Sequence, residues 1–214
     1  MLMMRRLTSL ATLLRHRGEC LEYLRSPKRQ LAREVIRSPA TPSDLLVEAG
    51  TTTEGERSFL AEIVRKSAGE AGPIIEIGTL FGFTTAEMAL QKAPDRLLLT
   101  VDCFSWNPWG LTSSEHKRLA ERVLLIGISR LNVKLIVSDK NAFYKSYAGA
   151  TPSMVFLDAI HTYEETRKDI EWATGLGCRF IAGHDYSDRF SGVKKAVNEI
   201  GSPEIRETVW LVHT

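Results

Sequence analysis

Residues 74–85 read Ile-Ile-Glu-Ile-Gly-Thr-Leu-Phe-Gly-Phe-Thr-Thr, and this stretch decides the fold. The mostly apolar run Ile74–Ile77 predicts a short buried strand, and Thr84–Lys92 predicts the helix that follows it. Gly78 and Gly82 open the turn between them, where a residue without a side chain lets the backbone approach a ligand closely. The turn has neither the G-x-G-x-x-G pattern nor the Lys-Ser/Thr ending of a phosphate-binding loop, which disfavours a dinucleotide or a triphosphate.

Outward from this unit, strands and helices alternate along the chain. Further strands are predicted at Leu97–Val101, Val133–Val137, Met154–Leu157, Arg179–Ala182 and Thr208–Val212. Further helices are predicted at Ser113–Leu131, near Asn141–Tyr147, from the cap Thr162-x-x-Glu165 to about Thr174, and at Gly192–Ile200. Apolar strands alternating with helices are typical of a parallel sheet that is covered on both faces. We therefore expect an α/β, doubly wound, Rossmann-like sheet with strand order 3-2-1-4-5 and an antiparallel last strand. The short tail from Pro203 to Thr214 is expected to supply that one strand only.

The first 50 residues carry a different pattern from the rest. Leucines at alternating three- and four-residue steps predict two helices, about 4–25 and 27–37, and a Pro- and Ser-rich linker follows at 38–52. The capping box Thr53-x-x-Glu56 then begins the main domain. We expect a helical extension over 1–50, which either forms a homodimer or caps the main domain, and a ligand-binding domain over 51–214.

Composition narrows the class of protein. Of 214 residues, 43% are hydrophobic and 25% charged, which is ordinary for a globular protein and excludes a disordered chain. The net charge of +2 is too balanced to indicate nucleic acid, although residues 1–39 are locally basic. Cys20, Cys103 and Cys178 are dispersed, which favours a reducing, cytoplasmic location and no structural zinc. The sequence has no run of about 18 apolar residues, so it predicts no membrane-spanning helix. An organellar transit peptide is the alternative interpretation of the N-terminus.

Polar residues follow all five predicted parallel strands, at the edge where ligands bind in this architecture. Glu76 places negative charge beside the glycine turn, and Asp102 lies 26 residues later, where an acidic side chain can accept both ribose hydroxyls. Ligands are therefore expected to carry a cationic centre and a ribose. The later strand ends contribute Ser138, Asp139, Asp158, His161, His184, Asp185 and Tyr186.

The ordered set Glu76-Ile-Gly-Thr-x-x-Gly, Asp102, Asp158-x-x-His161-x-Tyr-Glu and His184-Asp-Tyr resembles the class I S-adenosylmethionine-dependent methyltransferases. More narrowly, it resembles the small-molecule O-methyltransferases of sugars and macrolides and the cephalosporin-hydroxylase-like proteins, over roughly residues 55–200. The resemblance implies S-adenosyl-L-methionine as cofactor and a small-molecule hydroxyl as methyl acceptor. It implies that Glu76, Gly78, Thr79 and Gly82 line the methionine part, that Asp102 holds the ribose, and that Cys103, Phe104, Ser138 and Asp139 border the adenine. Helix capping is the alternative role for Glu76 and for Asp139.

The fourth and fifth strands should be neighbours, so Asp158, His184 and Asp185 should converge as a site for Mg²⁺ or Mn²⁺. In the relatives the fifth strand ends in two acidic residues. His184 departs from that pattern and shifts the preference toward Mn²⁺, Fe²⁺ or Zn²⁺, which accept imidazole. Alternatively, His184 and Asp185 bond to each other and order the following loop. The catalytic base is expected to be Asp158, His161 or His184, and His161 has a helix-start role as its alternative.

The acceptor pocket is less defined by the sequence. The aromatic loops 104–111 and 186–190 suit a flat or sugar-like acceptor, or else form a lid that excludes water. Trp172 and Trp210 are expected in the core. Two other functions stay open: an RNA methyltransferase guided by the basic N-terminus, which lacks support from any base-methylation motif, and a non-catalytic cofactor-binding or interaction protein.

Overall fold

The computed structural model of the chain describes residues 52–214. The helices predicted at 4–25 and 27–37, Cys20, the domain boundary at residue 50 and the homodimer expected through that extension lie outside the described residues. Within 52–214, no helix has the length and apolar character needed to cross a membrane.

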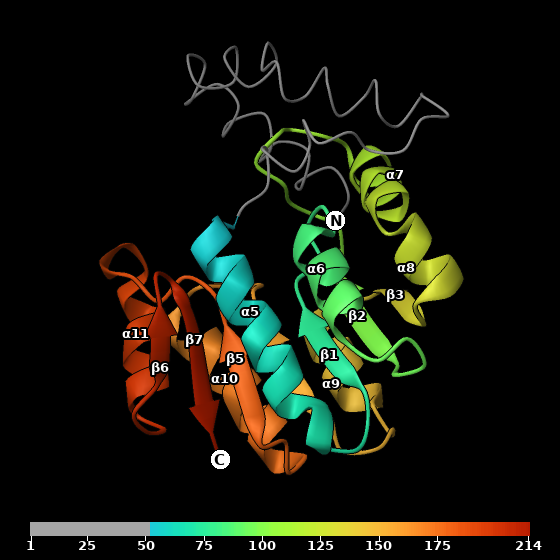
Figure 1. Cartoon of the computed structure of the whole chain (residues 1–214). Coiled ribbons are helices and arrows are strands. Elements are labelled where there is room, and N and C mark those ends of the chain that lie inside the picture. The colour runs from blue at the N-terminus through green and yellow to red at the C-terminus, as the bar shows by residue number, and fades with distance from the viewer. Residues whose placement is uncertain (1–51) are drawn as a thin grey trace, which may run out of the picture.

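A seven-stranded sheet forms the centre of the described chain, in the order β3-β2-β1-β4-β5-β7-β6 (Figure 1). Its strands are β1 (Ile74–Ile77), β2 (Leu98–Asp102), β3 (Val133–Val137), β4 (Met154–Leu157), β5 (Phe180–Gly183), β6 (Glu204–Arg206) and β7 (Val209–His213). The first five strands are parallel, and β7 pairs antiparallel with β5. The expected order 3-2-1-4-5 with an antiparallel last strand is confirmed.

Helices cover both faces of the sheet (Figure 1). One face carries α5 (Glu54–Lys66), α6 (Phe83–Gln91) and α8 (Leu125–Arg130), and the other carries α9 (Lys140–Ser146), α10 (Tyr163–Gly175) and α11 (Ser191–Asn198). The helix α7 (Ser113–Val123) precedes α8, and the single turns η1 (Ser67–Gly69) and η2 (Asp188–Phe190) follow α5 and β5. The predicted capping box forms, because Thr53 and Glu56 bond reciprocally at the start of α5.

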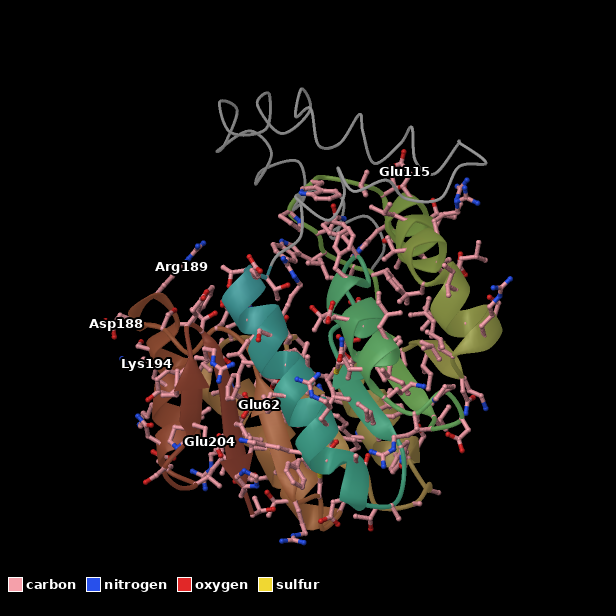
Figure 2. The ribbon with its side chains drawn as sticks, viewed as in Figure 1. Glu62, Glu115, Asp188, Arg189, Lys194 and Glu204 are labelled. Carbon is pink, nitrogen blue, oxygen red and sulfur yellow. The ribbon has the colours of Figure 1, made fainter. Side chains whose placement is uncertain are left out.

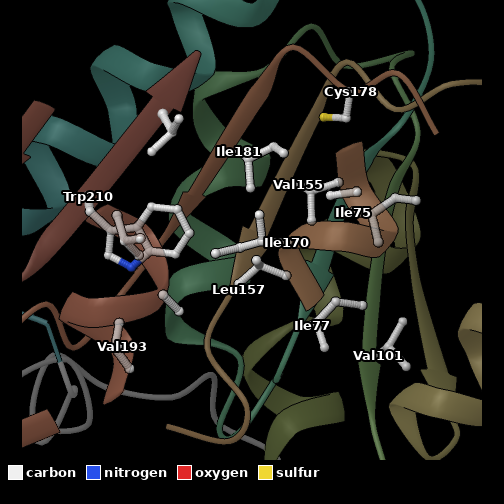
Figure 3. Close-up of a cluster of buried hydrophobic side chains, with 14 of the residues drawn as sticks. Ile75, Ile77, Val101, Val155, Leu157, Ile170, Cys178, Ile181, Val193 and Trp210 are labelled. Carbon is white, nitrogen blue, oxygen red and sulfur yellow. The ribbon is translucent and has the colours of Figure 1, made fainter. Parts of the chain in front are cut away.

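Two buried clusters hold the layers together, one on each face of the sheet. Ile75 and Ile77 point toward the cluster under α10 and α11, which Figure 3 shows together with Trp210. Ile74 points the other way, into the cluster with the apolar residues of α5 and α6. Because side chains alternate along a strand, the three isoleucines of β1 contribute to both clusters. Trp210 is fully buried, and Trp172 is partly buried in a stack on Tyr144, so both belong to the core as expected.

The helix predicted over Ser113–Leu131 is wrong in one respect, because the structure divides it into α7 and α8 at Leu124. Leu124 is fully buried, and its side chain lies beside Gly82. Gly127 packs closely on Val133 of β3. The bend at Leu124 lets α7 cover the loops at the sheet edge while α8 packs on β3, which the sequence pattern alone does not distinguish from one long helix.

The expectation that the tail supplies one strand is also wrong, because Glu204–Arg206 forms β6 and pairs antiparallel with β7. All three residues of β6 are exposed, and two of them are charged. A solvent-facing edge strand of three residues buries no apolar run, so hydrophobic periodicity gives no signal for it.

Candidate functional site

Three potential metal ligands meet where β4 and β5 end. The two strands are parallel neighbours, with Leu157 paired with Gly183, so the residues that follow them lie side by side. Asp158, His184 and Asp185 each offer a ligand atom, and these atoms all lie within 4.8 Å of one another. The convergence expected from the sequence is therefore present in the structure.

The His184 ring has one nitrogen facing the protein interior and one facing this cluster. Its Nε2 lies 3.2 Å from Oε1 of Glu56, which comes from the first turn of α5. Its Nδ1 lies 3.8 Å from Oδ1 of Asp158 and 3.7 Å from Oδ1 of Asp185, beyond hydrogen-bonding distance. His184 and Asp185 therefore do not hydrogen-bond each other, and the alternative role for this pair is not seen.

The electrostatics of this pair are strongly perturbed. Burial by itself would lower the pKa of His184, but the hydrogen bond to Glu56 and the charges of Asp158 and Asp185 outweigh it and raise this pKa to about 9. Burial would raise the pKa of Glu56, but hydrogen bonds from His184, Thr208 and the Thr53 backbone lower it to about 2. Without a metal ion, His184 is therefore a cation at neutral pH and lacks the free lone pair of a base.

His161 is placed differently. Its Nε2 lies 3.3 Å from Oδ2 of Asp185, and its ring packs against Phe190 of η2. Asp185 has a left-handed backbone (φ 61°), a conformation that aspartate tolerates better than most residues and that aims its carboxylate between the two histidines. His161 and His184 also line a common cavity of about 10 Å³, which is large enough for one water molecule. Burial raises the pKa of Asp158, the third candidate base.

The glycine turn after β1 packs directly on this cluster. Gly78 has φ +104°, and a Cβ placed on it would lie 2.0 Å from the backbone oxygen of Asp158. Gly82, with φ +85°, is the N-cap of α6. Gly78 is therefore required by the close approach of the chain to itself, in addition to any ligand, and the turn and the metal-ligand cluster share one wall.

Glu76 lies under this turn in a fully buried position. Its Oε2 accepts hydrogen bonds from Thr85 of α6 and, at 2.6 Å, from Thr100 of β2, while Oε1 has no hydrogen-bond partner within residues 52–214. Thr79 joins the same cluster through a 2.5 Å contact between its hydroxyl and that of Thr100. Burial raises the pKa of Glu76 to about 8, against the lowering effect of the two threonines and with help from Asp158 and Asp102. A helix-capping role, the alternative for Glu76, is not seen, because its carboxylate bonds to side chains.

Asp102 ties together the loops that follow β1 and β2. Its Oδ2 accepts from the Leu80 backbone N–H at 2.8 Å, and its Oδ1 accepts from that of Phe104 at 2.6 Å. Leu80 and Phe104 both have left-handed backbones, with φ 46° and 53°. Such conformations cost on the order of 1–3 kcal/mol each and occur mainly where a site requires them. Each carboxylate oxygen retains acceptor capacity for a ligand hydroxyl.

The remaining predicted cofactor residues lie at the same edge. Cys103 is exposed, and its sulfur lies 3.1 Å from the Ser105 hydroxyl. Ser138 is exposed. Asp139 is the N-cap of α9 and accepts from the backbone of Asn141 at 2.9 Å, so the alternative role named for it is present. A cap of this kind leaves its second oxygen available to a ligand.

The aromatic loop 104–111 folds onto the turn rather than standing open. Trp109 stacks on Phe81 at 3.9 Å, and Phe104 packs edge-on against His116 of α7. His116 is fully buried, and its Nε2 lies 2.8 Å from the Leu80 carbonyl oxygen. Trp106 is 69% exposed and is the aromatic side chain of this loop that remains free for an acceptor. Most of this loop thus packs on the glycine turn and on α7, and the interpretation as a lid that excludes water stays a prediction.

Sequence reasoning missed two residues that the structure places at this edge, Glu56 and His116. The sequence pattern predicts Glu56 only as the second member of a capping box at a helix start. His116 lies within a polar helix, and its burial depends on the loop 104–111, from which Phe104 packs on its ring. Neither position carries a local signal, because both roles depend on tertiary contacts.

The comparisons with known proteins agree with this geometry at the level of the fold. An O-methyltransferase from Bacillus cereus, solved with S-adenosylhomocysteine, superposes with a TM-score of 0.59 at 16% identity, covering 92% of this chain and 96% of that one. This chain has the fold of the O-methyltransferases. TomG of Streptomyces achromogenes, an O-methyltransferase of tomaymycin synthesis solved with S-adenosylmethionine, has a TM-score of 0.57 at 15% identity, over 87% and 88% of the two chains.

A third similar structure is that of an enzyme named for TDP-rhamnose. CalS11, a TDP-rhamnose 3′-O-methyltransferase of calicheamicin biosynthesis, has a TM-score of 0.58 at 14% identity and covers 88% of this chain and 95% of its own. No protein-family model and no curated protein matches the sequence. At these identities the likeness establishes the methyltransferase fold, and the activity of this chain is inferred from its own residues.

Proposed function

We propose that this protein transfers the methyl group of S-adenosyl-L-methionine to a hydroxyl group of a small-molecule acceptor, with a divalent metal ion at the acceptor side. The observation that carries the proposal is the arrangement at one edge of the sheet. A buried acid under a glycine turn, an acid at the end of β2, and three converging metal ligands occur there together. This fold places ligands at the same edge.

The cofactor would lie across the ends of β1, β2 and β3. Glu76 with Gly78, Thr79 and Gly82 would border the methionine part, and the unpartnered Oε1 of Glu76 supplies negative charge toward a cationic ligand. Asp102 would accept the ribose hydroxyls. Cys103, Ser138 and Asp139 would border the adenine. A cationic ligand favours the ionised form of Glu76, which offsets the burial that otherwise keeps it neutral.

The residues present fit a divalent ion. Ligand atoms about 2.0–2.2 Å from a common ion lie between roughly 3 and 4.4 Å from one another. The 3.7 and 3.8 Å separations from His184 Nδ1 to the two aspartates fall in that range. Asp158, His184 and Asp185 would hold the ion, and an imidazole in the set favours Mn²⁺, Fe²⁺ or Zn²⁺ over Mg²⁺. When bound, the ion would lower the pKa of the acceptor hydroxyl and hold it in place.

Among the three candidate bases, His161 has the best geometry. Its Nε2 faces Asp185, so its Nδ1 is left to accept the hydroxyl proton. In the transfer, the carbon–sulfur bond of the sulfonium breaks as the carbon–oxygen bond to the acceptor forms, and the acceptor proton passes to His161. Because the sulfonium is already activated, most of the rate enhancement would come from in-line placement of the two reactants. A sugar-like acceptor is supported by the exposed Trp106 and by the likeness to CalS11.

The proposal is tested by calorimetric titration with S-adenosylhomocysteine, first in EDTA and then with Mn²⁺. We expect micromolar binding that Asp102→Ala weakens at least tenfold. Asp95→Ala is the matched control, because Asp95 is exposed at the opposite end of β2. Mn²⁺ is expected to bind the wild-type chain and not His184→Ala. Absence of S-adenosylhomocysteine binding in the folded wild-type chain would overturn the cofactor assignment.

A further inference from the structure

Glu56 lies far from the strand ends in the sequence and yet touches the candidate metal site. Its side chain is buried, and every one of its hydrogen bonds comes from a different structural element or from its own helix cap. The carboxylate Oε1 accepts from His184 Nε2 at 3.2 Å, from the Thr208 backbone N–H at 3.3 Å and from the Thr208 hydroxyl. The other oxygen, Oε2, accepts from the Thr53 backbone N–H at 2.8 Å.

Helix capping explains only half of this arrangement. The capping box uses Oε2 and leaves Oε1 free in an ordinary helix start. Here Oε1 is directed into the protein at His184 and at the turn between β6 and β7. A buried carboxylate with all of its contacts satisfied is rigid, and it fixes the groups that donate to it.

The element that carries Glu56 is itself held in place. Lys66 of α5 bonds to Glu204 of β6 at 2.9 Å, and Arg206 of β6 bonds to Glu62 of α5 at 3.0 Å. Figure 2 shows Glu62 and Glu204 next to each other where α5 crosses the β6–β7 hairpin. At the other end of α5, Thr53 donates to Glu207 of the hairpin turn. The Glu56 carboxylate is therefore set at a defined distance from the end of β5.

We infer that Glu56 is a positioning residue of the candidate metal site, which orients the His184 ring and fixes Nδ1 as the nitrogen that binds the ion. The inference rests on the proposed function for the presence of a metal ion, and it adds a residue from α5 to the residues at the strand ends.

The chemical reason lies in the two nitrogens of imidazole. A neutral ring carries its proton on one nitrogen and its lone pair on the other, and a hydrogen-bond acceptor beside one nitrogen decides which is which. Glu56 accepts from Nε2, so the lone pair is available at Nδ1, which faces Asp158 and Asp185. Histidine ligands in metal sites commonly donate their other N–H to a carboxylate, and loss of that partner typically weakens metal binding by about 10–100-fold.

The test is Mn²⁺ affinity of the full-length chain, measured by calorimetry and by the electron paramagnetic resonance signal of free Mn²⁺. Glu56→Ala is expected to weaken Mn²⁺ binding about 10–100-fold. Glu56→Gln keeps an oxygen that can accept from His184 and is expected to lose clearly less affinity than Glu56→Ala. Glu54→Ala is the matched control, because it removes the other acidic side chain in the first turn of α5, and that side chain is exposed. It should leave Mn²⁺ affinity unchanged.

The S-adenosylhomocysteine affinity of the same variants separates positioning from damage to the fold. A positioning role predicts that Glu56→Ala binds S-adenosylhomocysteine as the wild type does while its Mn²⁺ affinity falls. Equal Mn²⁺ affinity in wild type, Glu56→Gln and Glu56→Ala would overturn the inference and leave the metal site standing. A wild-type chain that binds S-adenosylhomocysteine but no Mn²⁺ would overturn the metal site and this inference together, and would leave the cofactor assignment intact.

Discussion

Glu76 holds a carboxyl group in full burial, with one oxygen unpartnered among the described residues. Such a group costs stability, on the order of 1–3 kcal/mol, and is retained where it serves a ligand. Its pKa in the folded chain is about 8, raised chiefly by burial from the ordinary 4.5. The folded state thus holds a proton that the unfolded state releases between these values. Protonation of Glu76 therefore favours the folded state. This contribution to the free energy of unfolding is full below pH 4.5 and is lost as the pH rises through about 8.

Glu76→Gln should therefore remove this pH dependence. We expect the unfolding free energy of the wild type to fall relative to that of the variant by at most about 1.4 kcal/mol per pH unit between pH 5 and 8. The same variant should bind S-adenosylhomocysteine at least tenfold more weakly, because it lacks the carboxylate charge of Glu76 that would face the cationic amino group of the ligand. Urea unfolding at pH 5 and pH 8, with calorimetry at pH 8, measures both effects. A variant that binds as tightly as the wild type would remove Glu76 from the cofactor site.

The Glu56–His184 pair makes a second pH-dependent contribution, which is defined for the metal-free protein. The pKa of His184 is raised from 6.5 to about 9, so its contribution is full below pH 6.5 and is lost as the pH rises through 9. The pKa of Glu56 is lowered from 4.5 to about 2, so its contribution is full above pH 4.5 and is lost as the pH falls through 2. In EDTA, the wild type should lose stability between pH 6.5 and 9 relative to His184→Asn, by at most about 1.4 kcal/mol per pH unit. Parallel curves for the two proteins in urea unfolding would contradict this assignment.

At the scale of elements, the turn between β1 and α6 joins the cofactor side of the site to the metal side. Gly78→Ala places a Cβ 2.0 Å from the Asp158 backbone oxygen and also disfavours the φ of +104°. We expect a loss of at least about 2 kcal/mol in stability, with weaker binding of both S-adenosylhomocysteine and Mn²⁺. Gly175→Ala, at the end of α10, is the control, because nothing lies within 4 Å of the added Cβ. Thermal unfolding and calorimetry of both variants distinguish this effect from a general intolerance of alanine.

The elements that the sequence predicted well are strands whose residues are mostly apolar. The predictions for Ile74–Ile77, Val133–Val137 and Met154–Leu157 match β1, β3 and β4 residue for residue. The bend at Leu124 and the strand β6 were missed because neither changes the apolar pattern along the chain. Both depend on tertiary contacts. The bend forms where Leu124 packs beside Gly82, and β6 forms by pairing with β7.

The candidate site divides in the same way. The meeting of Asp158, His184 and Asp185 follows from strand order, because parallel neighbours end at one edge. The partner of His184 does not follow from strand order. Glu56 precedes the sheet in the sequence, and only the packing of α5 against the β6–β7 hairpin brings its carboxylate to the end of β5.

For the molecule as a whole, a ligand that binds only the folded state raises its stability by mass action. S-adenosylhomocysteine at 100 times its dissociation constant should increase the unfolding free energy by about 2.7 kcal/mol. The increase should persist in EDTA, because the cofactor residues are separate from the metal ligands. In Asp102→Ala at the same concentration, a tenfold loss of affinity should reduce it to about 1.4 kcal/mol, and a larger loss should reduce it further. Thermal unfolding with and without the ligand measures it. An undiminished gain in Asp102→Ala would place the ligand elsewhere on the protein.

The central claim is that one edge of the sheet holds both a nucleoside-containing cofactor and a metal ion. The most direct measurement is a crystal structure of the full-length chain with S-adenosylhomocysteine and Mn²⁺, with diffraction data that show the anomalous signal of manganese. We expect the ligand over the Gly78 turn with its ribose on Asp102, and an anomalous peak between Asp158, Asp185 and Nδ1 of His184. A ligand bound at any other surface, or manganese bound away from these three residues, would contradict the claim.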